Sequence, residues 1–407
     1  MNAIELPVPK ALTLGEEIAF ARMAVARAPK SPMNASRLAH LLLMDDKFDE
    51  AAELLRLDGH ETDDPSDLSL QYAAAIARET PAGNVAARDC ATRAVAAAGN
   101  NAEKAQALAN LGKTHARLSD IAAARTALLE ALELDPANKD AFKRITALDL
   151  EAGNTVAALD RADRAIALGI THSRVLAARV LALAKLGRIE ESRAASGIEA
   201  GLARRFPGAP EGWATLEAFN AALAEEFANH PGTRFDRYGA ASERTWRIDN
   251  PLLTRSKVAP ALFEMIAREV EAHIDELASR PGAASDPWRK GRPSRLRMHG
   301  WCVMVDGDGF ETWHVHQFGW LSGVYYADIP DFIANGEDNG GCLAHGLPED
   351  LVGADRQAEF GQKIFRPTTG DLLLFPSHLY HRTFPHRGDR RRVCFAFDIR
   401  PAQSGEA

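Results

Sequence analysis

The sequence predicts an α+β protein with two regions, a repetitive helical region followed by a β-sheet domain. The first half of the chain is rich in alanine and leucine, and similar residues recur there at a fixed spacing. Prolines and glycines then gather between Arg204 and Pro210, where a helix is interrupted. From Ser294 onward apolar residues alternate at period two, the pattern of β-strands. We therefore predict a helical domain over residues 1–204 and a β-domain over residues 205–407.

The composition is ordinary for a globular protein. The 407 residues are 46% hydrophobic and 26% charged, and the formal net charge of -8 argues against nucleic acid as the main partner. No apolar run reaches the roughly 18 residues that span a bilayer, so we expect no membrane segment. The four cysteines lie far apart, so we expect free thiols rather than disulfides or structural zinc. The N-terminus lacks the apolar core of a signal peptide, and we expect a cytoplasmic protein.

The fixed spacing in the first half is 34 residues, and it indicates a stack of helix pairs. Ser119, Gly153 and Gly187 recur at this spacing, where each pair turns. Small residues let paired helices approach closely, and each pair buries its apolar face only against the next pair. The pattern resembles the tetratricopeptide repeat, with three units from Ala102 to Arg204 and an earlier one from Leu38 to Leu55, although that family's Trp and Tyr positions are absent. A plain helical bundle is the alternative; a repeat stack would offer a surface for a peptide or protein partner, for dimerisation, or as a spacer.

One further helix is predicted between the repeats and the β-rich segment. From Ala259 to Leu277, apolar residues fall at helical spacing along one face. His273 lies on that face, and we interpret it as a histidine of the core rather than as a ligand.

Three histidines in the β-domain indicate a metal site. His314 and His316 lie two residues apart on an expected strand that begins at Trp313, so their side chains should share a face. His381 follows an apolar strand over residues 372–375. Burying imidazoles together is unfavourable unless something pairs with them, and neutral nitrogen ligands suit Fe, Zn, Ni or Cu. Three such ligands would leave positions open for substrate and O2.

An arginine near the third histidine predicts an anion site. Alternation along the strand that begins at Arg392 places this residue, Cys394 and Ala396 on one face, which leaves room for a small anionic molecule. A guanidinium can hold a carboxylate through two hydrogen bonds. Arg390 shares the face and is the second candidate. A solvated basic turn is the alternative interpretation of both arginines.

These motifs together resemble those of the Fe(II)- and 2-oxoglutarate-dependent oxygenases. The matching bacterial and phage group has the order H-x-H, LSGVYY, G-x-L-x-x-FPS-x-x-x-H and then R. In this chain the order is filled by His314 and His316, residues 321–326, residues 370–377, His381 and Arg392. The resemblance covers roughly residues 210–400 and implies a double-stranded β-helix, or jelly roll.

The resemblance also implies roles for individual residues. His314 and His381 would bind Fe(II), and Arg392 would bind the distal carboxylate of 2-oxoglutarate. Tyr326, on the strand that follows the first ligands, would hydrogen-bond to that cosubstrate. O2 would be the other cosubstrate.

The chain departs from the wider superfamily at the second ligand. That superfamily has Asp or Glu two residues after the first histidine, whereas this chain has His316. Either His316 is a ligand in a three-histidine site, or water fills the position with His316 behind it, or no metal binds. Asp328 and Glu337 are carboxylates nearby in sequence, and a distant carboxylate ligand stays open. Candidate substrate contacts flank the ligands at Trp313, Gln317 and Trp320.

The leading hypothesis is a hydroxylase that uses Fe(II) and 2-oxoglutarate on an unidentified substrate, with a peptide or protein as the attractive class. One alternative is a cupin-like dioxygenase with three histidines and no cosubstrate, although the glutamate that cupins carry shortly after H-x-H is missing. Another is a non-catalytic interaction scaffold with a degenerate oxygenase domain. Only the 2-oxoglutarate hypothesis requires Arg392.

Overall fold

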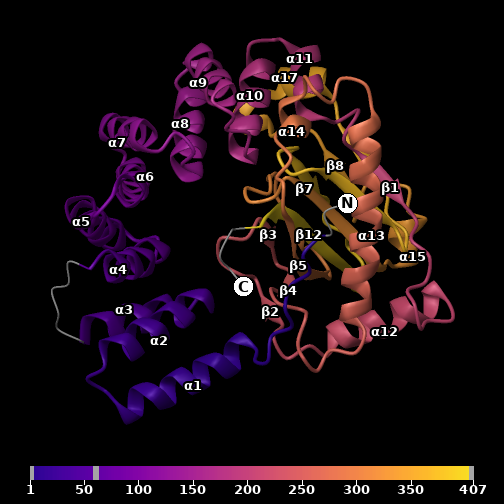
Figure 1. The fold of residues 1–407 in the computed structure, drawn as a ribbon, viewed down its shortest axis with the longest axis horizontal. Helices are drawn as coiled ribbons and strands as arrows, with labels where there is room; N and C mark the ends of the chain where they lie inside the picture. The colour runs from indigo at the N-terminus through magenta and orange to yellow at the C-terminus, as the bar shows by residue number, and fades with distance from the viewer. Residues whose placement is uncertain (1–3, 58–63, 403–407) are drawn as a thin grey trace. The chain divides into compact units, whose positions relative to one another are not determined.

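The computed structural model describes residues 4–57 and 64–402 (Figure 1). The chain forms two compact units. One is Leu12–Gly153, and the other combines Asn154–Ala407 with Met1–Ala11. The first unit is helical, and the second contains the β-sheets. The predicted order of a helical repeat followed by a β-domain is confirmed.

The helical unit is built from packed helix pairs. Gly112 of its sixth helix illustrates the close approach, because an added Cβ there would lie 2.6 Å from Cγ of Leu128 on the next helix. Asn100 and Asn138 cap two helices by accepting hydrogen bonds from backbone N–H groups three residues ahead. The helices are α1 (Leu14–Arg27), α2 (Pro32–Met44), α3 (Phe48–Leu57), α4 (Pro65–Ala77), α5 (Pro81–Ala97), α6 (Asn101–Arg117), α7 (Ile121–Leu134) and α8 (Lys139–Glu151).

Three more repeat-like helices, α9 (Thr155–Ala167), α10 (Ser173–Lys185) and α11 (Ile189–Ser196), belong to the second unit. The hydroxyl of Ser173 at the start of α10 donates to the carbonyl of Gly319 at 2.7 Å. Nζ of Lys185 at the end of α10 donates to the carbonyl of Leu351 at 3.1 Å. These helices therefore pack as part of the β-domain, although their sequence continues the repeat.

The described strands of the second unit form one large sheet and two small ones. The large sheet has the order β1-β10-β7-β12-β5-β4-β2, and the small sheets are β11-β8-β9 and β3-β6. All these strand pairs are antiparallel. The strands are β1 (Ala203–Arg205), β2 (Arg234–Phe235), β3 (Ser242–Glu243), β4 (Trp246–Ile248), β5 (Leu296–Val305), β6 (Phe310–Glu311), β7 (Leu321–Asp328), β8 (Leu343–His345), β9 (Lys363–Phe365), β10 (Leu372–Pro376), β11 (His381–Thr383) and β12 (Arg392–Pro401).

The outer face of the large sheet packs against helices. Phe263 of α13 (Ala259–Ser279) meets Phe395 of β12 edge-on at 5.0 Å between ring centroids. An added Cβ at Gly300 would lie 2.1 Å from the same Phe395 ring, so a glycine is required there. His273 of α13 is fully buried in this region, as predicted. The remaining helices are α12 (Leu216–Ala228), α13 (Ala259–Ser279), α14 (Pro287–Lys290), α15 (Asp331–Ala334), α16 (Glu349–Val352) and α17 (Ala354–Phe360).

The alternation predicted for the last strand is confirmed. Val393, Phe395 and Phe397 of β12 belong to the hydrophobic core between the sheet and its helices. The intervening residues of β12, beginning with Arg392, therefore face the inner side of the sheet. Leu321 and Tyr325 of β7 also lie in the core, so Tyr326 faces the same inner side. The inner side is where the candidate site is found.

The structure bears on two features expected from the composition, the state of the cysteines and the absence of a membrane-spanning helix. Cys90, Cys302, Cys342 and Cys394 are all free thiols, as predicted. Among the helices that the structure describes, none combines the length and apolarity needed to cross a membrane.

Two buried histidines should make the stability of the second unit depend on pH. Burial, with repulsion from Arg205, lowers the pKa of His273 to about 4, and burial also lowers the pKa of His378 to about 4. Unfolding below pH 6.5 therefore takes up protons, so stability is present above pH 6.5 and is lost as the pH falls toward 4. Each histidine contributes up to about 1.4 kcal/mol per pH unit in this window.

The expected result is a thermal unfolding midpoint that falls between pH 7 and pH 5. A double variant with His273 replaced by leucine and His378 replaced by asparagine should show a shallower fall of the midpoint. An equally steep fall in the double variant would contradict the assignment.

Candidate metal centre

The first two histidines of the predicted site lie in an extended segment after β6, and the third begins β11. The strand expected over Trp313–His316 does not form, and only an isolated bridge joins His314 to His381. The backbone N–H of His314 donates to the carbonyl of His381 at 3.0 Å, whereas that of His316 donates to Ser377 at 2.9 Å. The two acceptors, His381 and Ser377, are four residues apart, whereas the two donors, His314 and His316, are two residues apart. The unequal spacing does not fit a regular antiparallel ladder. The hydrogen bonds nevertheless hold the two segments together.

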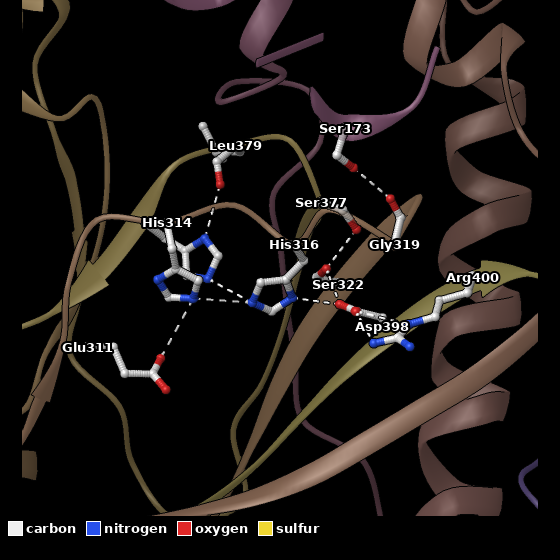
Figure 2. A network of polar contacts seen from close by, with 11 residues as sticks. Ser173, Glu311, His314, His316, Gly319, Ser322, Ser377, Leu379, Asp398 and Arg400 are labelled. Carbon is white, nitrogen blue, oxygen red and sulfur yellow. Dashed lines mark hydrogen bonds and ion pairs between the residues drawn. The ribbon is translucent and has the colours of Figure 1, made fainter. Parts of the chain in front are cut away.

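The three imidazole rings converge. Nε2 of His316 lies 3.3 Å from Nε2 of His314 and 3.2 Å from Nε2 of His381. One ligand atom from each ring can be chosen so that all lie within 4.8 Å of one another. Figure 2 shows the rings of His314 and His316 turned toward each other at the centre of a polar network. The structure therefore brings together the three histidines that the sequence singles out.

Each ring makes a hydrogen bond through its other nitrogen. Nδ1 of His314 lies 2.7 Å from the carbonyl oxygen of Thr312, and Nδ1 of His381 lies 3.0 Å from that of Leu379. A carbonyl oxygen only accepts, so both Nδ1 atoms carry the proton and both Nε2 atoms present a lone pair. Nδ1 of His316 lies 2.6 Å from Oδ1 of Asp398, and the carboxylate likewise accepts.

Three ring nitrogens therefore converge with no other group of the described chain between them. Such a cluster of imidazole nitrogens can hold a metal cation. Two nitrogen ligands at right angles, each about 2.1 Å from a shared metal, lie about 3 Å apart. The observed separations of 3.2 and 3.3 Å agree with this geometry. The donor set of three neutral imidazoles suits a first-row transition metal such as iron.

The protonation states of the site agree with its use as a ligand set. Burial, with repulsion from the neighbouring rings, lowers the pKa of His381 well below its usual value. Burial also lowers the pKa of His314. Both rings are therefore neutral near pH 7, as metal binding requires.

Asp398 supports His316 from behind. Burial alone would raise its pKa, but His316, Arg400 and the hydroxyl of Ser322 together hold that pKa well below its usual value. Oδ1 accepts from Ser322 at 2.9 Å, and Oδ2 accepts from Nη2 of Arg400 at 2.9 Å. Such a carboxylate fixes the tautomer and orientation of a metal-binding histidine and raises its basicity. Figure 2 shows this chain of contacts from Arg400 through Asp398 to His316.

A pocket between the large sheet and β8 and β11 joins the histidines to the predicted anion site. His316, His381, Tyr326 and Arg392 all line it. Arg392 is 2% exposed; Nη1 donates to the carbonyl of Gly341 at 3.0 Å, and Nε has no hydrogen-bond partner in the described residues. Burial raises the pKa of Tyr326, so its hydroxyl stays protonated and can donate a hydrogen bond. The small side chains of Cys394 and Ala396 also line the pocket.

The structure places the other candidates away from this pocket. Arg390 is exposed and pairs with Asp328 at 3.0 Å. Trp313 lies beneath the guanidinium of Arg382, and Gln317 accepts a hydrogen bond from Arg174 at 3.2 Å. Trp320 is a core residue that exchanges indole-to-carbonyl hydrogen bonds with Trp288. Trp313, Gln317, Trp320 and Arg390 do not line the pocket.

Sequence reasoning missed two residues of the site. Asp398 lies six residues after Arg392, so the alternation that selects the arginine also predicts an inward Asp398. Glu311 lines the pocket, and its Oε2 lies 3.9 Å from Nε2 of His314. Only its position three residues before His314 could have drawn attention to Glu311. The nearby carboxylates Asp328 and Glu337 do not line the pocket.

The sequence of this region matches a known family. Residues 299–398 match the model of a family described as "Putative 2OG-Fe(II) oxygenase". This segment is a 2OG-Fe(II) oxygenase domain. The match contains all three histidines and Arg392 and ends at Asp398, so the oxygenase domain and the geometric site coincide. The cofactors that the family implies are Fe(II) and 2-oxoglutarate.

Solved structures resemble both parts of the chain at low identity. A prolyl-4-hydroxylase from Pseudomonas putida is 13% identical, with 54% of this chain and 100% of that chain covered and a TM-score of 0.34. A 2OG-Fe(II) oxygenase family oxidoreductase from Burkholderia pseudomallei is 11% identical, with 52% and 90% covered and a TM-score of 0.32. YrrB, described as a TPR protein with an unusual peptide-binding site, is 14% identical, with 44% and 93% covered and a TM-score of 0.34. No curated protein sequence matches the chain.

Proposed function

We propose that this chain is an Fe(II)- and 2-oxoglutarate-dependent hydroxylase in which His314, His316 and His381 hold the metal. Arg392 binds the distal carboxylate of 2-oxoglutarate, and Tyr326 donates a hydrogen bond to the same molecule. The observation that carries the proposal is the shared pocket, with three imidazole nitrogens converging at one place and a buried guanidinium at another.

The buried guanidinium supports an anionic ligand in particular. A charge removed from water is costly unless it is paired and hydrogen-bonded. Within the described residues the guanidinium of Arg392 makes one hydrogen bond, to a carbonyl, and no ion pair. A dicarboxylate that chelates the metal at one end and reaches Arg392 with the other would satisfy both features. Bound Fe(II) and 2-oxoglutarate would supply the O2 activation needed to hydroxylate a C–H bond.

The protein's own residues would orient and shield this chemistry. Asp398 holds the ring of His316 in the tautomer that presents Nε2. The carbonyls of Thr312 and Leu379 do the same for the other two rings. Phe375 and Val324 form apolar parts of the pocket wall and exclude water.

A second candidate is a cosubstrate-free dioxygenase of the cupin type, and Glu311 favours it. Together with the three histidines, this carboxylate would complete a set of three nitrogens and one oxygen. That alternative gives Arg392 no role. The buried arginine is therefore the residue that separates the two candidates.

The substrate class in our proposal is a peptide or protein. The oxygenase domain follows a helical repeat, and stacks of this kind offer extended binding surfaces. A peptide partner held by the repeat would raise the local concentration of the group to be hydroxylated.

The test of the proposal is the affinity for 2-oxoglutarate in an Arg392→Gln variant. Removing one partner of a buried charge pair costs about 2 kcal/mol or more, so the dissociation constant should rise at least roughly 30-fold. The measurement is calorimetric titration of the Fe(II)-loaded protein under nitrogen. Arg390→Gln is the matched control, because this arginine is exposed and paired with Asp328. Equal affinities in the two variants would refute the role of Arg392, and unchanged Fe(II) binding in both would show that the metal site is intact.

A further inference from the structure

One arginine next to the metal centre faces away from it. In the sheet β11-β8-β9, His381 and Thr383 of β11 line the metal pocket, so Arg382 between them faces the opposite side of this sheet. Ala344 of β8 and Ile364 of β9 lie in register with Arg382 and share that side. These three residues define the outer face of the small sheet.

Two aromatic rings hold the guanidinium of Arg382. Its Cζ lies 4.8 Å from the ring centroid of Trp313 and 4.6 Å from that of Phe384. Both distances are within the range of about 6 Å at which a ring face attracts a cation. Gly346 lets the indole lie close to the small sheet, because an added Cβ there would be 3.1 Å from Cη2 of Trp313. The two rings restrict the side chain, so its planar fork is oriented before any ligand arrives.

The backbone that positions two metal ligands also positions this arginine. Trp313 precedes His314 in the chain, and Arg382 follows His381. The N–H of His314 donates to the carbonyl of His381 at 3.0 Å, and the N–H of His381 donates back to the carbonyl of His314 at 3.1 Å. A group bound by Arg382 is therefore held one residue along the chain from a metal ligand.

Among the residues that the structure describes, Arg382 has no partner for its charge. Its guanidinium makes no hydrogen bond and no ion pair with them, and its Nε is a buried donor without an acceptor. By contrast, Arg400 in the same unit pairs with Asp398 at 2.9 Å. Burial lowers the pKa of Arg382, and attraction from Glu349 opposes that shift. A partly buried guanidinium without acceptors is a suitable place for an anion from outside the chain.

We propose that Arg382, held between Trp313 and Phe384, binds the carboxylate of an acidic side chain in the peptide substrate. These three residues form an arginine clamp, and its role rests on the proposed function, which supplies the peptide. The terminal nitrogens of the guanidinium match the two oxygens of a carboxylate. Ile364, 45% exposed on the same face, offers apolar contact to the carbon atoms of such a side chain. Trp313 then contributes to substrate binding from outside the metal pocket.

A carboxylate suits the arginine clamp better than a phosphate group. A phosphate monoester carries close to two negative charges near pH 7. The clamp contains one cation, and the carboxylate of Glu349 lies near enough to attract Arg382. A single negative charge matches the clamp, whereas Glu349 would repel the second charge of a phosphate.

The test is the binding of a peptide to the full-length protein, measured by fluorescence anisotropy. The probe is a short labelled peptide of alternating glutamate and alanine with blocked ends, and the matched probe has glutamine in place of each glutamate. We expect the glutamate peptide to bind Arg382→Gln about tenfold more weakly than wild type. The glutamine peptide should bind both proteins equally, so that the loss belongs to the pair of charges.

Two further variants separate binding from folding. Arg390→Gln removes the same charge from an exposed arginine that pairs with Asp328, and it should bind the glutamate peptide as wild type does. Arg382→Lys keeps the charge but not the planar fork, so its affinity should lie between those of wild type and Arg382→Gln. Equal affinity for Fe(II) in all these proteins would show that His381 is undisturbed. Arg382→Lys also provides the test if Arg382→Gln does not fold.

Wild-type affinity of Arg382→Gln for the glutamate peptide would overturn the proposal. An equal loss for both peptides would also overturn it, because the arginine would then act only through the local structure. Tighter binding of a phosphoserine peptide of the same length, dependent on Arg382, would assign the clamp to phosphate instead. Peptide binding is measured without turnover. A chain that binds Fe(II) and 2-oxoglutarate but does not distinguish the two peptides would therefore retain the proposed hydroxylase function and lose the clamp.

Discussion

Replacing His381 by alanine is expected to abolish stoichiometric Fe(II) binding while the fold persists. The ring supplies one of three converging Nε2 atoms, and the other two cannot enclose a metal alone. Loss of a residue that only supports a ligand already costs about 10–100-fold in metal affinity, so loss of the ligand itself should cost more. Competition with a coloured chelator under nitrogen measures this affinity directly.

His299→Ala provides the control for this variant. His299 lies on β5 in the same unit, 5.8 Å from Trp301 between ring centroids, and is not one of the three grouped histidines. It should retain wild-type affinity for Fe(II). Wild-type affinity for Fe(II) in His381→Ala would contradict this prediction, because the converging rings would then not be the metal site.

Truncation should show that the oxygenase domain includes the last repeat-like helices. We expect a fragment of residues 154–407 to unfold cooperatively and a fragment of residues 205–407 to lack a cooperative transition. The shorter fragment loses Arg204, which makes two hydrogen bonds of 2.8 Å to the fully buried Asp371. Leaving a buried charge without its partner costs about 3–5 kcal/mol. It also loses most of β1, which covers the edge of β10.

Both fragments lack the N-terminal segment, so their comparison isolates residues 154–204. Among these, the carbonyl of Ala195 accepts a hydrogen bond from Nε2 of His378 at 3.0 Å, and the hydroxyl of Ser173 donates to Gly319, close in sequence to His316. Thermal unfolding followed by circular dichroism decides the question. Equal midpoints for the two fragments would show that the helices are dispensable and would support a boundary at residue 204.

The sequence predicted the residues of the site better than it predicted the strands on which they lie. Period-two alternation correctly assigned Arg392 to the inner face, but it assigned Arg390 to the same face. In the structure β12 begins at Arg392, so Arg390 lies before the strand, where it pairs with Asp328. The alternation pattern alone does not show where the strand begins. The strand expected at His314 fails for a similar reason, because its register depends on His381, a partner far along the chain. Local pattern does not encode such pairings.

The helical region shows a second limit. The repeat period identifies each helix pair, because small residues and turn glycines recur locally. It does not identify what covers the apolar face of a given pair. Helices α9–α11 continue the repeat pattern of α6–α8, yet they pack within the unit that contains the sheets. Their contacts to Gly319 and Leu351 are distant in sequence and leave no periodic signal.

We propose that three histidines hold Fe(II) in a pocket that also accepts 2-oxoglutarate. The decisive experiment is anaerobic titration of the purified chain with Fe(II), followed by 2-oxoglutarate. We predict one bound Fe(II) per chain and, on adding 2-oxoglutarate, the weak visible charge-transfer band of the chelate. Iron binding without that band would contradict the claim and favour the cosubstrate-free dioxygenase, and the absence of iron binding would leave an interaction scaffold.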